Sequence, residues 1–232
     1  MRVLRGVWAG LMAATTLAVP LLVSSVLVGD REVTARAAWL IAGVLSISIF
    51  AKVAMAMLRP ANLEMRRQPP IVGRARKQPV VDAVGLVAFL TYLIAWMAFI
   101  PVDAGRFHLL APPPAWAMAA GLAAAIVGLS ISHLAVWQNV FATPAIQQQA
   151  GQRVIDTGLY GLIRHPLYAG NLLFFAGAAL WMGSLAALAG VAVILVATLA
   201  RIVIEERYLR AQLPAYADYA RRVRARLVPF VI

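Results

Sequence analysis

The 232-residue chain contains no cysteine and few acidic residues, since nine Asp and Glu stand against 21 Lys and Arg. The lack of cysteine excludes disulfides, thiolate catalysis and cysteine-ligated metals. Charged residues are also scarce, at 13% against about 25% in soluble domains. Hydrophobic residues make up 62%, more than a soluble globule of this length can bury and far more than disordered chains contain. The composition predicts a polytopic membrane protein built as one structural domain.

Six apolar stretches are long enough, or nearly so, to cross a bilayer as helices, which takes about 20 residues. They cover residues 8–28, 37–57, 81–101, 115–136, 167–182 and 185–203. The first run exceeds the apolar core of a signal peptide, about 7–15 residues, so we expect a retained helix. Gly183-Ser184 separates the last two. The sequence therefore predicts an all-α polytopic membrane protein with about six hydrophobic helices, of which the last two form a short hairpin.

Positive charge is distributed unevenly between the two sides that six crossings define. The N-terminus, the 58–80 loop, the 137–166 segment and the C-terminal tail hold 17 Lys and Arg, whereas the opposite loops hold three. Because Lys and Arg accumulate in cytoplasmic loops, both termini are predicted to be cytoplasmic, in a membrane expected to be the bacterial inner membrane. The net charge of +12 is then explained by topology and anionic lipids. No nucleic-acid partner is expected, since no base-reading module accompanies the cations.

Polar residues are concentrated on either side of the predicted hairpin. Before it, the Gln-rich segment 138–166 ends in Arg164-His165-Pro166. Proline suits the first turn of a helix, and a helix N-terminus favours anions. After the hairpin, Arg201 and Glu205 are four residues apart and share one helical face. A hairpin brings both clusters to the same membrane face, where they predict a pocket for a zwitterionic cofactor with an aromatic base.

Each of these residues also has a simpler explanation when it is taken alone. Arg201 could reach the lipid head groups and pair with Glu205, and His165 could be an interfacial histidine without a task. Farther on, apolar residues recur at spacings of four and three, which predicts an amphipathic helix interrupted by Pro214. This helix would lie on the membrane surface or close over the pocket. The stripe comprises Leu209, Leu213, Tyr216, Ala220, Val223 and Leu227.

Four motifs resemble the isoprenylcysteine carboxyl methyltransferase family, whose wider superfamily includes bacterial phospholipid N-methyltransferases. They are Gly158-Leu-Tyr160, Arg164-His-Pro-Leu-Tyr168-Ala-Gly170, Arg201-Ile-Val-Ile-Glu-Glu206 and Tyr216-Ala-Asp-Tyr219. The resemblance covers about residues 138–230. It divides the single domain into the N-terminal transmembrane helices on the acceptor side, 1–137, and a methyltransferase region, 138–232.

The resemblance implies S-adenosylmethionine as methyl donor, bound at the cytoplasmic face. It implies that Arg201 is the catalytic residue that faces an acceptor carboxylate, and that Glu205 meets the amino-acid end of the cofactor. A carboxylate is ionised at pH 7 and needs no general base and no metal. The implied cofactor-binding residues are Gln147, Gln152, Val154, Ile155, Tyr160, His165, Pro166, Leu167, Tyr168 and Glu205.

The sequence thus predicts an integral membrane S-adenosylmethionine-dependent methyltransferase that O-methylates the carboxylate of a lipophilic acceptor, such as a prenylcysteine. Three alternatives stay open: a phospholipid or amine N-methyltransferase, an NADPH-dependent membrane steroid reductase, which shares an Arg-His-Pro-x-Tyr stretch, and a non-catalytic membrane protein. Membrane lipids and a lipophilic or lipidated acceptor are the expected partners. The residues do not indicate an oligomeric state.

Overall fold

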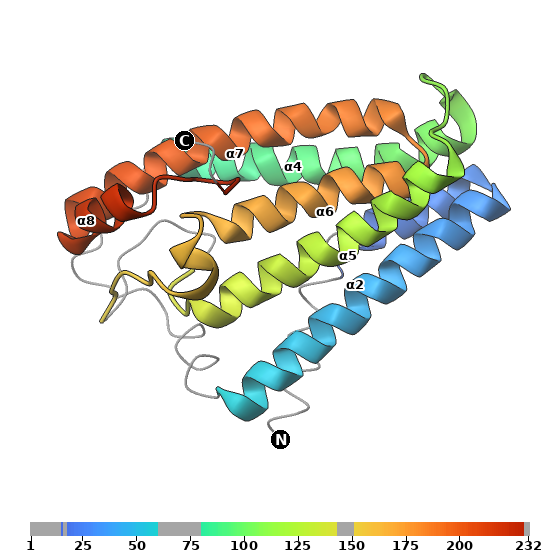
Figure 1. Ribbon diagram of the computed structural model, residues 1–232. Helices are drawn as coiled ribbons and strands as arrows, with labels where there is room; N and C mark the ends of the chain where they lie inside the picture. Colours follow the sequence, from blue (N-terminus) through green and yellow to red (C-terminus); the bar gives the residue numbers. More distant parts are fainter. Residues whose placement is uncertain (1–14, 16–17, 60–79, 143–150, 230–232) are drawn as a thin grey trace.

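The computed structural model describes residues 15, 18–59, 80–142 and 151–229, which form helices joined by loops and turns. The long helices lie alongside one another as a bundle, with α8 and the neighbouring turns at one end (Figure 1). The elements are helix Ala18–Val28, α2 (Arg31–Leu58), α4 (Val80–Val102), the π-helix η1 (Asp103–Phe107), α5 (Ala115–Gln138), the 3₁₀ helix η2 (Gly158–Gly161), α6 (Pro166–Met182), α7 (Leu185–Gln212) and α8 (Ala215–Arg222).

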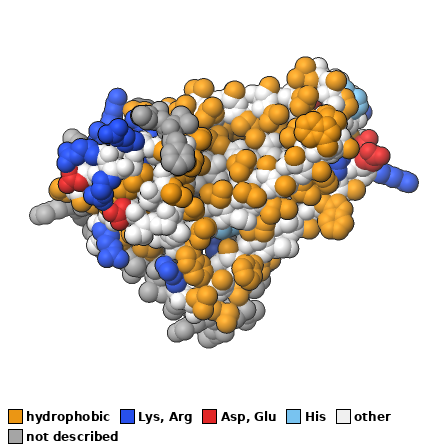
Figure 2. All heavy atoms as spheres, viewed as in Figure 1, with side chains coloured by type: hydrophobic (Ala, Val, Ile, Leu, Met, Phe, Trp, Pro, Cys, Tyr) orange, Lys and Arg blue, Asp and Glu red, His pale blue; other side chains and the backbone are white. Residues whose placement is uncertain are grey.

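Four helical stretches in the described part of the chain are long and apolar enough to cross a membrane. They are Arg31–Leu58, Val87–Phe107, Ala115–Gln138 and Leu185–Gln212, and the apolar helices Ala18–Val28 and Pro166–Met182 are shorter. Figure 2 shows hydrophobic side chains over the body of the bundle and a gathering of Lys and Arg at the end that carries α8. The prediction of an all-α polytopic membrane protein is confirmed. Of the predicted span 8–28, residues 8–14 and 16–17 lie outside the described residues, and the last part forms the helix Ala18–Val28.

Helices α5 and α6 lie in very close contact because glycines face the opposing backbone along the pair. A Cβ at Gly128 would lie 2.5 Å from the backbone nitrogen of Phe174, and one at Gly121 would lie 2.7 Å from that of Trp181. Small residues let helix backbones approach in a membrane, where burial of apolar surface drives no association between helices. The contact brings the start of α6 to the end of α5, where the polar residues gather.

The turn between α6 and α7 has the geometry that Gly183-Ser184 predicts. Gly183 adopts φ +90° at the end of α6, a left-handed conformation that favours glycine. The Ser184 hydroxyl oxygen accepts a hydrogen bond from the backbone nitrogen of Ala187, and the hydroxyl donates to the buried carboxylate of Asp103. Ser184 therefore caps α7 and joins it to η1, which directly follows α4.

Two predicted boundaries differ from the observed ones. Helix α7 continues to Gln212, well past the predicted end at 203. The added residues include good helix formers, and the helix stops only at Leu213, which precedes Pro214 and is extended. The amphipathic helix is confirmed as α8, but it ends at Arg222, so Val223 and Leu227 lie beyond it.

We expect Gly128→Ala to lower the free energy of unfolding by about 1–3 kcal/mol, because the new methyl group forces α5 and α6 apart. Denaturant titration in detergent micelles measures this change. Gly43→Ala in α2 is the control, since nothing lies within 4 Å of a Cβ there. It should stabilise the protein slightly, by about 0.5–1 kcal/mol. Equal effects of the two substitutions would show that the α5–α6 contact is not tight.

Candidate functional site

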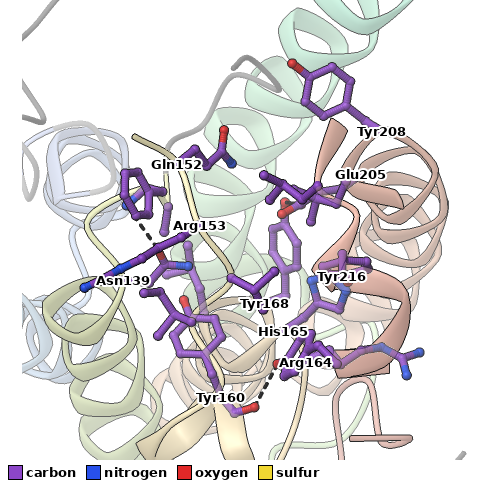
Figure 3. A pocket seen from close by; sticks show the side chains of 18 residues that line it. Asn139, Gln152, Arg153, Tyr160, Arg164, His165, Tyr168, Glu205, Tyr208 and Tyr216 are labelled. Carbon is purple, nitrogen blue, oxygen red and sulfur yellow. Dashed lines mark hydrogen bonds between the residues drawn. The ribbon is translucent and has the colours of Figure 1, made fainter. Parts of the chain in front are cut away.

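A pocket lies at the end of the bundle where α6 begins and α7 ends. One wall is formed by the segment that we call the strap, residues 151–157, and the opposite wall by α7 and α8 with Glu205 and Tyr216 (Figure 3). The lining residues are Asn139, Phe141, Ala142, Gln152, Arg153, Val154, Ile155, Tyr160, Arg164, His165, Leu167, Tyr168, Glu205, Tyr208, Leu209, Leu213, Tyr216 and Tyr219.

A buried ion pair between Arg164 and Glu206 joins the start of α6 to α7. The Nε atom of Arg164 donates to Oε1 of Glu206 at 2.8 Å, and the two residues are 7% and 4% exposed. His165 Nε2 lies 3.1 Å from the same carboxylate oxygen. Since Glu206 is surrounded by cationic and hydrogen-bonding groups, it can remain ionised although it is buried.

The side chain of Arg164 also hydrogen-bonds to backbone oxygens at the end of α8. Its Nη1 atom donates to the backbone oxygens of Val223 and Arg224 at 2.8 and 3.0 Å. These are carbonyls at and just beyond the end of α8, where a cation is favoured. The backbone nitrogen of Arg164 also donates to the backbone oxygen of Ala225 at 2.9 Å. Arg164 thus holds α8 and the chain after it across the pocket.

Glu205, Tyr168 and Arg201 form a second hydrogen-bonded group in this region. Tyr168 Oη donates to Oε2 of Glu205 at 2.7 Å and accepts from Nε of Arg201 at 3.1 Å. The Tyr168 ring stacks on His165, with ring centroids 5.7 Å apart and planes at 28°. Tyr168 is therefore held on three sides, and Arg201 contacts the pocket wall through it.

Two tyrosines of α8 complete the pocket. Tyr219 Oη donates to the backbone oxygen of Tyr160 at 2.8 Å, which ties α8 to the 3₁₀ turn η2. Burial raises the pKa of Tyr219, and the neighbouring Tyr160 raises it further, so the phenol stays neutral. On the surface, Arg222 Nη2 lies 2.6 Å from the Asp156 carboxylate in the strap. These contacts place α8 against the pocket, which is one of the two predicted positions of this helix.

Most of the predicted cofactor residues come together in this pocket. Those that line it are Gln152, Val154, Ile155, Tyr160, His165, Leu167, Tyr168 and Glu205. Pro166 lies at the first turn of α6 and Arg201 lies on α7, and neither is among the lining residues. Gln147 falls outside the described residues. The geometry does not test the roles, which stay predictions.

Several residues of the site were not predicted. Glu206 is the carboxylate that pairs with Arg164 and His165, although the motif drew attention to Glu205. Tyr208 lies three residues after Glu205 on α7, so helical spacing could have found it. Asn139, Phe141 and Ala142 directly follow α5 and had no signal in the sequence. Among the described residues, no group of three His, Asp or Glu is placed to hold a metal ion.

Comparison with known proteins is consistent with this architecture. Residues 116–215 match the family model described as phospholipid methyltransferase. The cobalt-zinc-cadmium resistance protein CzcN of Cupriavidus metallidurans is 30% identical over 112 residues, which are 47% of this chain and 50% of that protein. The chain therefore spans about half the length of the curated relative that it matches.

The fold defines the class: an all-α polytopic membrane protein with a pocket at one end of its helix bundle. Within this class, residues 116–215 are similar to the phospholipid methyltransferase family, in agreement with the resemblance drawn from the motifs. The matched residues run from α5 through α7 to the start of α8, and they include the strap and both members of the Arg164–Glu206 pair.

We expect Glu206→Gln to lower the free energy of unfolding by about 3–5 kcal/mol, because it leaves Arg164 buried without its counter-ion. The matched control is Asp218→Asn, which removes the partner of Arg221 in an exposed ion pair on α8. That change should cost about 1 kcal/mol or less. Denaturant titration in micelles compares the two variants, and a loss no larger for Glu206→Gln than for Asp218→Asn would contradict the role of the pair.

Proposed function

We propose that the protein is an S-adenosylmethionine-dependent methyltransferase that acts on the carboxylate of a lipophilic acceptor. The observation that carries the proposal is the pocket itself. Most of its lining residues lie within the region that matches the phospholipid methyltransferase model, and it combines a carboxylate, Glu205, with amide and aromatic side chains. The family match favours methyl transfer over NADPH-dependent reduction and over a non-catalytic role.

The chemistry of the pocket fits the proposed cofactor. S-adenosylmethionine has an ammonium group, a carboxylate, a ribose and a flat adenine. Glu205 is suited to an ammonium group, and Gln152 and Asn139 have amides that both donate and accept hydrogen bonds. Aromatic side chains such as Phe141 and Tyr160 provide surfaces against which a base can pack. We propose that Glu205 binds the amino-acid end of the cofactor.

When bound, S-adenosylmethionine supplies a methyl group already activated by the sulfonium charge. The protein then has to align donor and acceptor, and orientation alone can supply much of the rate. Tyr168 is suited to this task because Glu205, Arg201 and His165 hold its ring and hydroxyl in one position. A guanidinium has five N–H donors, so Arg201 could hold Tyr168 and orient an acceptor carboxylate at once.

The acceptor is proposed to be lipophilic and to reach the pocket from the membrane, as a prenylcysteine-like carboxylate would. A second candidate is the amine head group of a phospholipid, which the description of the matched family favours. An amine must lose a proton before methyl transfer, and an arginine beside it would help less than beside a carboxylate. We further propose that the pocket end and both termini are cytoplasmic, because Lys and Arg gather at this end (Figure 2).

Glu205→Gln should weaken S-adenosylmethionine binding by about 10- to 100-fold, since a hydrogen bond to a charged group contributes about 1.5–3 kcal/mol. Calorimetry on protein in micelles measures the dissociation constant. The control is Glu32→Gln in the first turn of α2, which should bind like the wild type. Binding of NADPH in place of S-adenosylmethionine would instead support the reductase alternative.

Arg201→Ala should lower turnover with a carboxylate acceptor by about 100-fold or more, by analogy with the loss of one aligned donor in other active sites. Its effect on cofactor affinity should be much smaller than that of Glu205→Gln. The dissociation constant and the rate of methyl transfer are measured on the same preparation. Wild-type cofactor affinity in both variants would contradict the assigned pocket.

Transfer of a labelled methyl group into a total lipid extract identifies the acceptor. A carboxyl methyl ester releases labelled methanol in mild base, whereas an N-methyl group keeps its label. We expect base-labile label in a lipophilic product. Base-stable label in an amine head group would select the second candidate, and the absence of label in any lipid would favour a non-catalytic protein.

A further inference from the structure

Two tyrosines on α8 face the pocket in the same way but differ in their hydrogen bonding. Tyr216 and Tyr219 are three residues apart and therefore share one face of the helix. Their ring centroids are 5.6 Å apart, and the residues are 4% and 3% exposed. Both line the pocket that Glu205 and the strap also form. The two hydroxyl groups therefore lie in similar, buried surroundings.

Only one of these two hydroxyls is satisfied within the described part of the chain. Tyr219 Oη donates to the backbone oxygen of Tyr160. Tyr216 Oη is buried, and no hydrogen-bond partner for it exists among the described residues. Buried polar atoms nearly always have a partner, because leaving one unsatisfied is unfavourable. An unsatisfied hydroxyl on a pocket wall therefore indicates that a bound ligand supplies the missing hydrogen-bond partner.

The surroundings of Tyr216 also determine which kind of ligand atom it can meet. Burial raises the pKa of Tyr216, and the nearby Glu206 carboxylate raises it further, so the hydroxyl keeps its proton. A protonated phenol is both a donor and an acceptor. The carboxylate of Glu206 already interacts with Arg164 and His165. The hydroxyl proton is therefore suited to an oxygen or nitrogen acceptor on a bound molecule.

The position of Tyr216 does not depend on a hydrogen bond of its own. Arg164 holds the backbone at the end of α8, and Tyr219 ties the same helix to η2. The Tyr216 ring packs edge-on against Tyr219, with planes at 63°. The hydroxyl is thus preorganised, so little conformational entropy is lost when a ligand meets it.

We propose that the Tyr216 hydroxyl donates a hydrogen bond to a polar atom of the bound nucleoside cofactor, which makes α8 part of the cofactor site. This inference rests on the proposed function, because it takes the pocket to be the S-adenosylmethionine site. The strap, α7 and α8 then contact the cofactor from opposite sides. Tyr216 is a binding residue in this role and takes no part in methyl transfer itself.

The test compares Tyr216→Phe with Tyr219→Phe, which each remove one hydroxyl from the same helix face. Calorimetry with S-adenosylmethionine and with S-adenosylhomocysteine measures affinity in micelles, and thermal unfolding without ligand measures stability. Tyr216→Phe should weaken binding of both ligands by about 3- to 10-fold, the range of one net hydrogen bond. Its unfolding midpoint without ligand should be unchanged or raised. Tyr219→Phe should lower that midpoint, because it leaves the oxygen of Tyr160 without its donor.

Two results would overturn the inference while the proposed function stands. In the first, the wild-type protein binds the cofactor and Tyr216→Phe binds it equally well. In the second, Tyr216→Phe lowers the ligand-free midpoint as Tyr219→Phe does and leaves affinity unchanged, which would make the hydroxyl purely structural. A wild-type protein that binds neither nucleoside ligand would overturn the proposed function and this inference together.

Discussion

The buried ion pair between Arg164 and Glu206 is the interaction on which the pocket depends. Its members are 42 residues apart in the chain, and the guanidinium also binds the carbonyls at the end of α8. Taking two charges out of water costs several kcal/mol for each ion, so such a pair persists only where further hydrogen bonds surround it. Here His165 supplies one of them to the carboxylate. Arg164 lies at the start of α6, Glu206 lies on α7, and the carbonyls that Arg164 binds lie at the end of α8. The ion pair therefore fixes the positions of these three elements relative to one another.

The membrane explains why this polar assembly lies at one end of the bundle. Within hydrocarbon, each backbone N–H and C=O must be satisfied inside the protein, so the spanning segments are helices. Apolar burial does not hold such helices together, and close backbone contact at glycines such as Gly128 takes its place. Pro166 can begin α6 at the edge of this contact because the first turn needs no N–H there. The tight α5–α6 pair thus provides a rigid base for the strap and for Tyr168.

Much of the site could be predicted from the sequence because its residues flank a hairpin. His165 precedes the hairpin and Glu205 follows it, so chain connectivity alone places them together. The choice between Glu205 and Glu206 was not predictable in this way. Adjacent residues on a helix point about 100° apart, and which of them faces Arg164 depends on the rotation of α7 against its neighbours. The structure turns Glu206 inward to Arg164 and leaves Glu205 in contact with Tyr168.

Four properties could be read from the sequence alone: the membrane class, the approximate helices, the resemblance to a methyltransferase family and the end of the bundle where polar residues gather. These properties follow from the length of apolar runs and from motifs that are local in the chain. The three-dimensional packing was needed to show that α7 continues past the predicted span, that α8 lines the pocket, and that Arg201 contacts Tyr168. It also distinguished Tyr216 from Tyr219, which look alike in the helical pattern. The physical reason is that side-chain partners depend on packing between segments far apart in sequence, which no local pattern specifies.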